Sequence, residues 1–215
     1  MARTVLQNPE ICLSTADEFC RVTPPEWSVV KERASRLPEG YSKTMVEEIQ
    51  KAYPDKFGTM EEAYMVFDVV KAVIANGLKN MDVVDLEGLG EFRVEPGEGG
   101  IRQVVFTPEP GLNTAIKESK QPEKASGERA GRLPDGYSKT MVLELQRGYP
   151  DKFKSIEEAY MAFDVMRGVI IKGLIKKDTV DVEGLGEFRA DSDSVTFKSE
   201  TGLTAAINES RPHEG

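Results

Sequence analysis

The spacing of apolar positions first predicts a short helix over residues 44–53. Thr44 is followed three residues later by Glu47, which is the spacing of a capping box at the start of a helix. Pro54 cannot continue a helix, so the helix is expected to end before it. Three apolar side chains recur at helical spacing and share one face: Met45, Ile49 and Tyr53.

A second and longer helix is predicted from Thr59 onwards, ending near Gly77 or Asn80. Thr59 and Glu62 form another capping box. Apolar side chains line two faces of this helix, and a helix that is apolar on two sides has to be covered on two sides. The first face carries Met60, Ala63, Phe67, Val70, Ile74 and Leu78, and the second carries Met65, Val66, Val69 and Val73.

Downstream of the helices, the period changes to the alternation that is typical of strands. Residues 82–86 (DVVDL) and 91–94 (EFRV) alternate on either side of a glycine-rich turn, and 103–106 (QVVF) supplies a return strand. A last short helix is expected from Leu112. The order of two helices, three strands and one helix predicts the α+β class, with a three-stranded antiparallel sheet.

The whole pattern occurs twice. Residues 36–57 (RLPEGYSKTMVEEIQKAYPDKF) match residues 132–153, and the agreement continues without a gap to Arg93 and Arg189. Beyond these arginines the second copy is shorter, because the offset between the copies falls from 96 to 91. We therefore expect an N-terminal extension (1–35), a first repeat (36–119), a polar linker (120–131), a second repeat (132–210) and a tail (211–215).

The repeat suggests what covers the second apolar face of the long helix. One short helix and one small sheet within the same repeat give cover on one side only, so we expect the second side to meet the other repeat. The alternative is a helix that is fully buried within an independent domain. In the second copy the long helix begins with an equivalent capping box at Ser155 and Glu158.

Composition excludes several classes of chemistry. Cys12 and Cys20 have a spacing that fits no zinc pattern, and we expect free thiols in a reducing cytoplasm, with a disulfide as the alternative. The single histidine, His213, lies in the tail, so no nucleophile–histidine set can be assembled. Adjacent carboxylates such as Glu61 and Glu62 are expected to face water. We expect no enzymatic activity, no cofactor and no metal.

Charge and hydropathy narrow the expected partners. The formal net charge of −9 opposes unspecific coating of DNA. No apolar run approaches the roughly 18 residues of a membrane span, and the N-terminus lacks the features of a signal peptide. A cytoplasmic protein without a membrane partner is expected. A Pro-containing start near Trp27 predicts a further short helix in the extension.

Taken together, these elements resemble the bacterial HU and integration host factor family of DNA-binding proteins. The resemblance is carried by SKTMVEEI, by GLKNMDVVDLEG, by GLGEFRV at 88–94, which begins with Gly88, by VVFTPEPGLNTAI, and by their partners in the second copy. Family members are intertwined dimers of this unit. The resemblance therefore implies an intramolecular pseudodimer of two HU-like repeats, monomeric in solution and associated with the bacterial nucleoid.

The resemblance also implies phosphate contacts by the body of the protein. A lysine and a hydroxyl at a helix start, close-approach glycines and nearby basic groups suit a phosphate. Ser and Thr equally cap helices, Gly equally suits tight hairpins, and lysines at a helix end equally complement its dipole. The candidate residues are Ser42, Lys43, Thr44, Gly88, Gly90, Arg93, Arg102, Ser138, Lys139, Thr140, Lys172, Lys176, Lys177, Gly184, Gly186 and Arg189.

The sequence departs from the family at the arms. EPGEGGIR (95–102) and DSD (191–193) stand where the family has long basic ribbons, so Pro96 is not expected to wedge between base pairs. Residues 36–119 hold 9 basic and 15 acidic groups and residues 132–210 hold 11 and 14, which favours the second repeat for contact with DNA. Acidic residues beside the hairpins oppose that contact: Glu87, Glu91, Glu95, Glu183, Glu187, Asp191 and Asp193.

Three functional hypotheses follow. The first is weak binding of duplex DNA through the body, without bending by arms. The alternative is an acidic interaction module that engages a basic protein and does not bind DNA. A third is pairing with, and modulation of, a conventional HU subunit.

Overall fold

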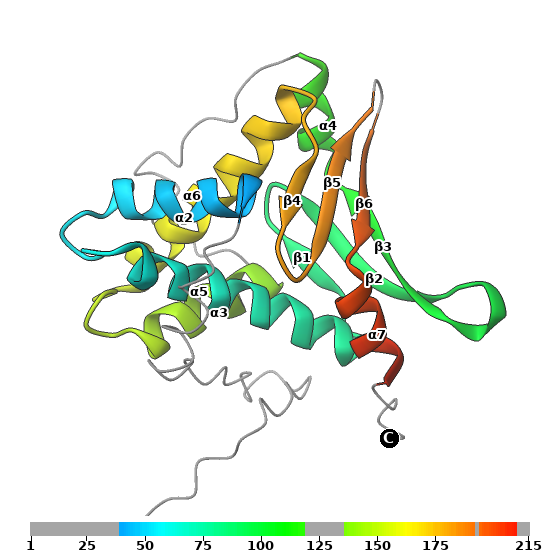
Figure 1. Cartoon of the computed structure of the whole chain (residues 1–215), viewed down its shortest axis with the longest axis horizontal. Coiled ribbons are helices and arrows are strands. Elements are labelled where there is room, and N and C mark those ends of the chain that lie inside the picture. The colour runs from blue at the N-terminus through cyan, green and yellow to red at the C-terminus, as the bar shows by residue number, and fades with distance from the viewer. Residues whose placement is uncertain (1–38, 119–135, 192–193, 210–215) are drawn as a thin grey trace, which may run out of the picture.

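The computed structural model describes residues 39–118, 136–191 and 194–209, and its class is α+β. Helices α2, α3, α5 and α6 gather on one side of the molecule, and the strands lie on the other side with α4 and α7 beside them (Figure 1). The first half holds α2 (Gly40–Ala52), α3 (Met60–Lys79), β1 (Val84–Leu86), β2 (Gly90–Pro96), η1 (Glu98–Gly100), β3 (Arg102–Pro108) and α4 (Pro110–Lys117). The second half holds α5 (Gly136–Gly148), α6 (Ile156–Ile175), β4 (Val180–Val182), β5 (Gly186–Ala190), β6 (Val195–Ser199) and α7 (Thr201–Glu209).

Each half has the predicted order of two helices, three strands and one helix. The strands form two antiparallel sheets, with the orders β1-β2-β3 and β4-β5-β6. Among the helices of the described ranges, none combines the length and the apolar character that crossing a membrane requires. The predictions for Cys12, Cys20, Trp27 and His213 lie outside the described residues.

Helix α2 begins earlier than expected, and the capping box predicted at Thr44 and Glu47 is wrong. Thr44 lies inside the helix, where its hydroxyl donates to the carbonyl of Gly40 at 3.2 Å. In the first turn, the N–H of Tyr41 donates instead to the carboxylate of Asp181 in the second half, at 3.0 Å. A partner so distant along the chain cannot be found from local spacing. The helix ends at Ala52, before the proline, as predicted.

Helices α3 and α6 begin where their capping boxes place them. The hydroxyl of Thr59 accepts a hydrogen bond from the N–H of Glu62, and the hydroxyl of Ser155 accepts one from the N–H of Glu158, both at 3.3 Å. These bonds satisfy N–H groups that the first helical turn leaves free. Helix α3 ends at Lys79, within the predicted range.

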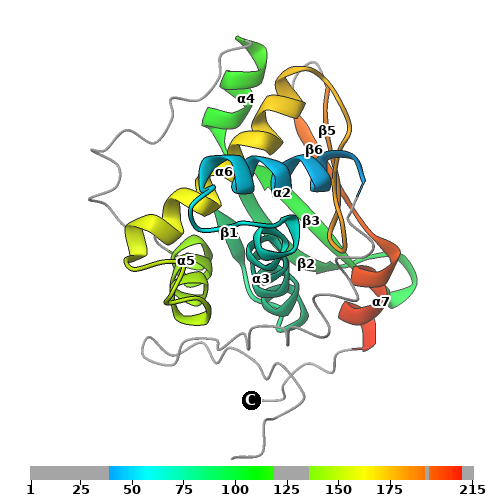
Figure 2. The same ribbon diagram turned by 60° about the vertical axis from the view of Figure 1, so that its left-hand side comes forward.

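The two halves interleave. Helix α2 packs against α6 and β4 as well as against α3, and α5 packs against α3 and β1 as well as against α6. Each short last helix lies on the long helix of the other half, α4 on α6 and α7 on α3. Figure 2 shows α2 lying across α6. Helix α3 is thus covered by elements of both halves, and residues of both its apolar faces belong to one core.

Four phenylalanine rings join the two sheets. In each sheet the alternation of the strands points two of them to the inner face, and they lie opposite each other in the register. Between sheets, Phe92 meets Phe197 at a centroid distance of 5.0 Å and Phe106 meets Phe188 at 5.4 Å. Both contacts are edge-to-face, which is a favourable geometry for aromatic pairs.

The loops before α3 and α6 also meet across the halves. Glu62 was expected to face water, but its carboxylate pairs with Lys152 at 2.9 Å. The hydrogen bond from Lys152 is the largest cause of the lowered pKa of Glu62. The reciprocal pair joins Lys56 and Glu158 at 2.8 Å.

The two hairpins differ in length, as the sequence predicts. Strands β2 and β3 have 7 residues each, whereas β5 and β6 have 5. The β2–β3 hairpin projects from the body beside α7 (Figures 1 and 2). The strand pair is fastened to α7 next to its turn, because the amide of Asn208 accepts the N–H of Arg102 at 2.8 Å and donates to its carbonyl at 3.0 Å.

Candidate nucleic-acid interface

The start of α2 is docked onto the strand β4 of the other half. Ser42 is fully buried, and its hydroxyl accepts the N–H of Glu183 at 2.8 Å and donates to the carbonyl of Asp181 at 3.1 Å. The carboxylate of Asp181 also accepts the N–H of Tyr41. The negative group that a helix start favours is therefore supplied by the protein itself.

The start of α5 repeats this arrangement with the roles of the halves exchanged. Asp85 accepts the N–H of Tyr137 at 3.1 Å, and the buried hydroxyl of Ser138 accepts the N–H of Glu87 at 2.8 Å. Both helix starts that the family resemblance assigns to phosphate thus hold an aspartate. The hydroxyl of Thr140 donates to the carbonyl of Gly136, just as that of Thr44 donates to the carbonyl of Gly40 in α2.

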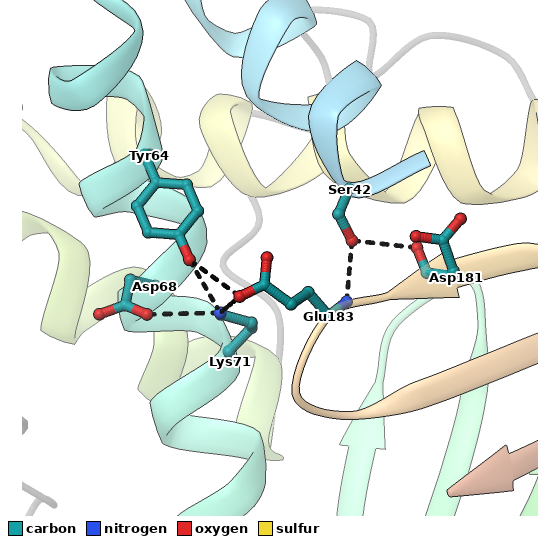
Figure 3. A network of polar contacts seen from close by, with 6 residues as sticks. All are labelled: Ser42, Tyr64, Asp68, Lys71, Asp181 and Glu183. Atoms are coloured by element: carbon teal, nitrogen blue, oxygen red, sulfur yellow. Dashed lines mark hydrogen bonds and ion pairs between the residues drawn. The ribbon is translucent and has the colours of Figure 1, made fainter. Parts of the chain in front are cut away.

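A polar network that sequence reasoning missed lies next to the start of α2 (Figure 3). Lys71 on α3 pairs with Asp68 at 3.4 Å and with Glu183 at 3.8 Å. It also donates to the hydroxyl of Tyr64 at 3.4 Å, and that hydroxyl lies 3.3 Å from the carboxylate of Glu183. The side chain of Lys71 is only 12% exposed, so the ammonium is held between the two halves.

An equivalent network surrounds Arg167 on α6. Its guanidinium pairs with Asp164 and donates to the carbonyl of Glu87 at 3.1 Å, while the hydroxyl of Tyr160 donates to the carboxylate of Glu87 at 3.2 Å. Glu87 and Glu183 therefore join the halves. A signal was present in the sequence, because a tyrosine, an aspartate and a basic residue recur at the same spacing in YMVFDVVK and YMAFDVMR.

The hairpin glycines serve the fold. A Cβ at Gly90 would lie 2.3 Å from the carbonyl oxygen of Thr107, and one at Gly186 would lie 2.2 Å from that of Lys198. Close pairing with the return strand therefore requires both glycines. Gly88 and Gly184 have φ +79°, and the N–H of Gly88 donates to the carboxylate of Glu109 at 2.9 Å.

The candidate arginines are each engaged within the protein. On the outer face of the sheets, Arg93 pairs with Glu91 of its own strand, and Arg189 pairs with Glu187 at 2.9 Å. Arg102, next to the turn of the projecting hairpin, donates to the carbonyl of Ile207 at 3.3 Å. The carboxylates of Glu91 and Glu187 reduce the positive potential that Arg93 and Arg189 would offer to a phosphate.

The candidate lysines remain on the surface. Lys172, Lys176 and Lys177 are exposed at the end of α6, and none of them forms an ion pair in the part of the chain that the structure describes. Lys43 is 51% exposed, and its ammonium lies 3.9 Å from the carboxylate of Glu47. Lys139 is half-buried at the start of α5.

A small cavity lies between the long helices and the sheets. Its volume is about 30 Å³, room for roughly two water molecules. Apolar side chains from both halves line it, with Lys71 and Arg167 at its margin. In the described ranges, no group of three or more His, Cys, Asp or Glu side chains is placed to hold a metal ion.

The fold and these contacts define an α+β protein in which two similar halves share one core. Comparison with models of protein families, with characterised proteins and with solved structures gives no match to the chain.

Proposed function

We propose that the chain is a non-enzymatic, HU/IHF-like pseudodimer that binds duplex DNA weakly through its body and acts at the bacterial nucleoid. The interleaving of the halves carries this proposal. Each first helix and each last helix packs on the long helix of the other half, and the two sheets lie together around four phenylalanines. This is the arrangement implied by two HU-like units fused in one chain.

The proposed function excludes bending by intercalation. Family arms are ribbons long enough to carry a wedge residue into the minor groove. Here β2 ends at Pro96, and the turn η1 closes the hairpin within a few residues. A body without grasping arms binds by phosphate contact, and such binding depends strongly on salt.

A titration of the full chain against duplex DNA and against distorted DNA, at low and at moderate salt, tests the proposal. We expect binding at low salt that weakens steeply as salt rises, with a slope set by the number of phosphates neutralised. A monomeric mass for the full chain, and an isolated repeat that unfolds or dimerises, are also expected. Failure to bind DNA at low salt would refute the proposed function, and a stable monomeric repeat would refute the pseudodimer.

A second candidate function is an acidic module that engages a basic protein. The pairing of Arg93 with Glu91 and of Arg189 with Glu187 favours it, because the exposed arginines of the sheets are partly neutralised. In this case the same titration detects no DNA binding, while a lysine-rich polypeptide binds in a salt-dependent manner. Pairing with a conventional HU subunit is a third possibility, and it is detected as a mixed complex by size-exclusion chromatography.

A further inference from the structure

The repeat creates two equivalent places on the surface, and their chemistry differs. Each lies where the first helix of one half meets the end of the long helix of the other half. One, here called the basic flank, consists of Lys43, Lys172, Lys176 and Lys177. The other, here called the neutral flank, consists of the equivalent residues Lys139, Asn76, Asn80 and Met81.

Tyr41 holds the two parts of the basic flank together. Its ring lies against the end of α6, since a Cβ at Gly173 would lie 2.7 Å from the ring edge. Its hydroxyl donates to the carboxylate of Asp178, directly after the lysines of α6. The start of α2, with Lys43, is thereby fixed beside the end of α6, although the two segments come from different repeats.

Two carboxylates beside the basic flank accept hydrogen bonds from neutral groups and so keep their charge, and the neutral flank has the equivalent pair, Asp82 and Asp85. Asp178 accepts the hydroxyl of Tyr41, and Asp181 accepts the N–H of Tyr41. Glu47 lies near Lys43 at 3.9 Å, a long separation between two exposed side chains. The three lysines of α6 therefore face solvent without an ion pair among the described residues, and they complement the negative end of the helix dipole.

We infer that this protein contacts the phosphates of a nucleic acid on one side only, through the basic flank, so that it binds DNA asymmetrically in spite of its two-fold repeat. The inference rests on the proposed function. The neutral flank has the same arrangement. Tyr137 packs on Gly77 and donates to Asp82, just as Tyr41 packs on Gly173 and donates to Asp178. The side chains differ: the three lysines of α6 correspond to Asn76, Asn80 and Met81, whereas Lys79 of α3 corresponds to Ile175. The lysines of the basic flank are therefore in excess by two at the helix end.

Two triple variants with the same change of net charge test the inference. The first is Lys172→Ala/Lys176→Ala/Lys177→Ala on the basic flank. The matched control is Lys51→Ala/Lys139→Ala/Lys154→Ala, which takes one lysine from the neutral flank and two from elsewhere. For the first variant we expect the affinity for duplex DNA at low salt to fall about tenfold or more, and the slope of log K against log salt to fall by about 1 for each phosphate that the variant no longer neutralises. For the control we expect affinity to fall by about threefold or less, with an unchanged slope.

A third variant adds the basic side chains to the other flank. Asn76→Lys/Asn80→Lys/Met81→Lys should increase the slope of log K against log salt by about 2 to 3, because it builds a second phosphate-contacting flank. Circular dichroism checks that each variant is folded. If the wild-type chain binds no DNA, the proposed function fails. If it binds DNA but the first variant and the matched control are weakened equally, the one-sided inference fails while the proposed function stands.

Discussion

The networks around Lys71 and Arg167 occupy equivalent positions, yet they hold the halves together in different ways. Lys71 reaches the carboxylate of Glu183, which is 44% exposed, at 3.8 Å. Arg167 is only 5% exposed and donates to the carbonyl of Glu87. A planar guanidinium can serve a carboxylate and a backbone carbonyl at once, whereas an ammonium acts as a compact point charge. The two repeats therefore carry equivalent cross-links that differ in hydration. The one at Lys71 ends on a partly exposed carboxylate, and the one at Arg167 ends on a backbone carbonyl.

The largest effect is expected when Arg167 is removed. Arg167→Ala should lower the free energy of unfolding by about 3 kcal/mol or more, because it leaves Asp164 and the carbonyl of Glu87 without the guanidinium and removes a buried side chain. Urea unfolding followed by circular dichroism measures the change. Arg189→Ala, on the exposed face, is the matched control, with an expected change within about 0.5 kcal/mol. Equal effects at the two positions would contradict a structural role for Arg167.

Removing Lys71 should cost less. Lys71→Ala is expected to lower the free energy of unfolding by about 1 to 2 kcal/mol. Asp68, which is 12% exposed, loses its ammonium partner, but water can solvate the carboxylate of Glu183, and no backbone carbonyl is left without a donor. A double-mutant cycle with Glu183→Ala, read by urea unfolding, isolates the pair across the halves. We expect a coupling of about 0.5 to 1 kcal/mol. A cost equal to that of Arg167→Ala would show that the two networks are equivalent after all.

Local spacing predicts the features that are closed within a few residues. The capping boxes at Thr59 and Ser155 are predictable because both partners of each hydrogen bond lie in one turn. The two apolar faces of α3 likewise predicted cover from the other half. The start of α2 could not be predicted, because its N–H group is satisfied by Asp181, which lies far along the chain.

The candidate site shows the same limit. The exposure of Lys172, Lys176 and Lys177 follows from their place at the end of an amphipathic helix. The aspartates at both helix starts depend on contacts between the halves. The arginines pair with glutamates two residues away on the same strand, which strand alternation places on the same face. The networks around Lys71 and Arg167 were missed because a polar residue inside an apolar helix gives no sign of its partner. Its recurrence in both copies was the one available signal.

Alanine substitutions at two equivalent glycines beside the networks allow a finer comparison of how tightly each network is packed. Gly88 and Gly184 share a φ of +79°, so alanine is strained at both by about 1 kcal/mol. A Cβ at position 88 would also lie 2.9 Å from a guanidinium nitrogen of Arg167, whereas one at position 184 would lie 3.9 Å from Lys71. Gly88→Ala should therefore destabilise the protein more than Gly184→Ala, by about 1 kcal/mol in urea unfolding. In the background of Arg167→Ala the difference should vanish; its persistence would point to a cause other than this contact.

The smallest effect is expected from pH, and it concerns the tyrosines that fasten each first helix. Burial, followed by the hydrogen bond to Asp178, raises the pKa of Tyr41 from 10.0 to about 12, and burial with the bond to Asp82 raises the pKa of Tyr137 as well. A raised pKa favours the protonated phenol in the folded state, so its contribution is complete below pH 10 and is lost as pH rises towards about 12. Chemical unfolding at a series of pH values should show stability that falls above pH 10. Tyr41→Phe should flatten that fall in part, because the phenol that ionises in the unfolded chain is then absent. An unchanged pH dependence in Tyr41→Phe/Tyr137→Phe would show that these two hydroxyls do not couple the halves to pH.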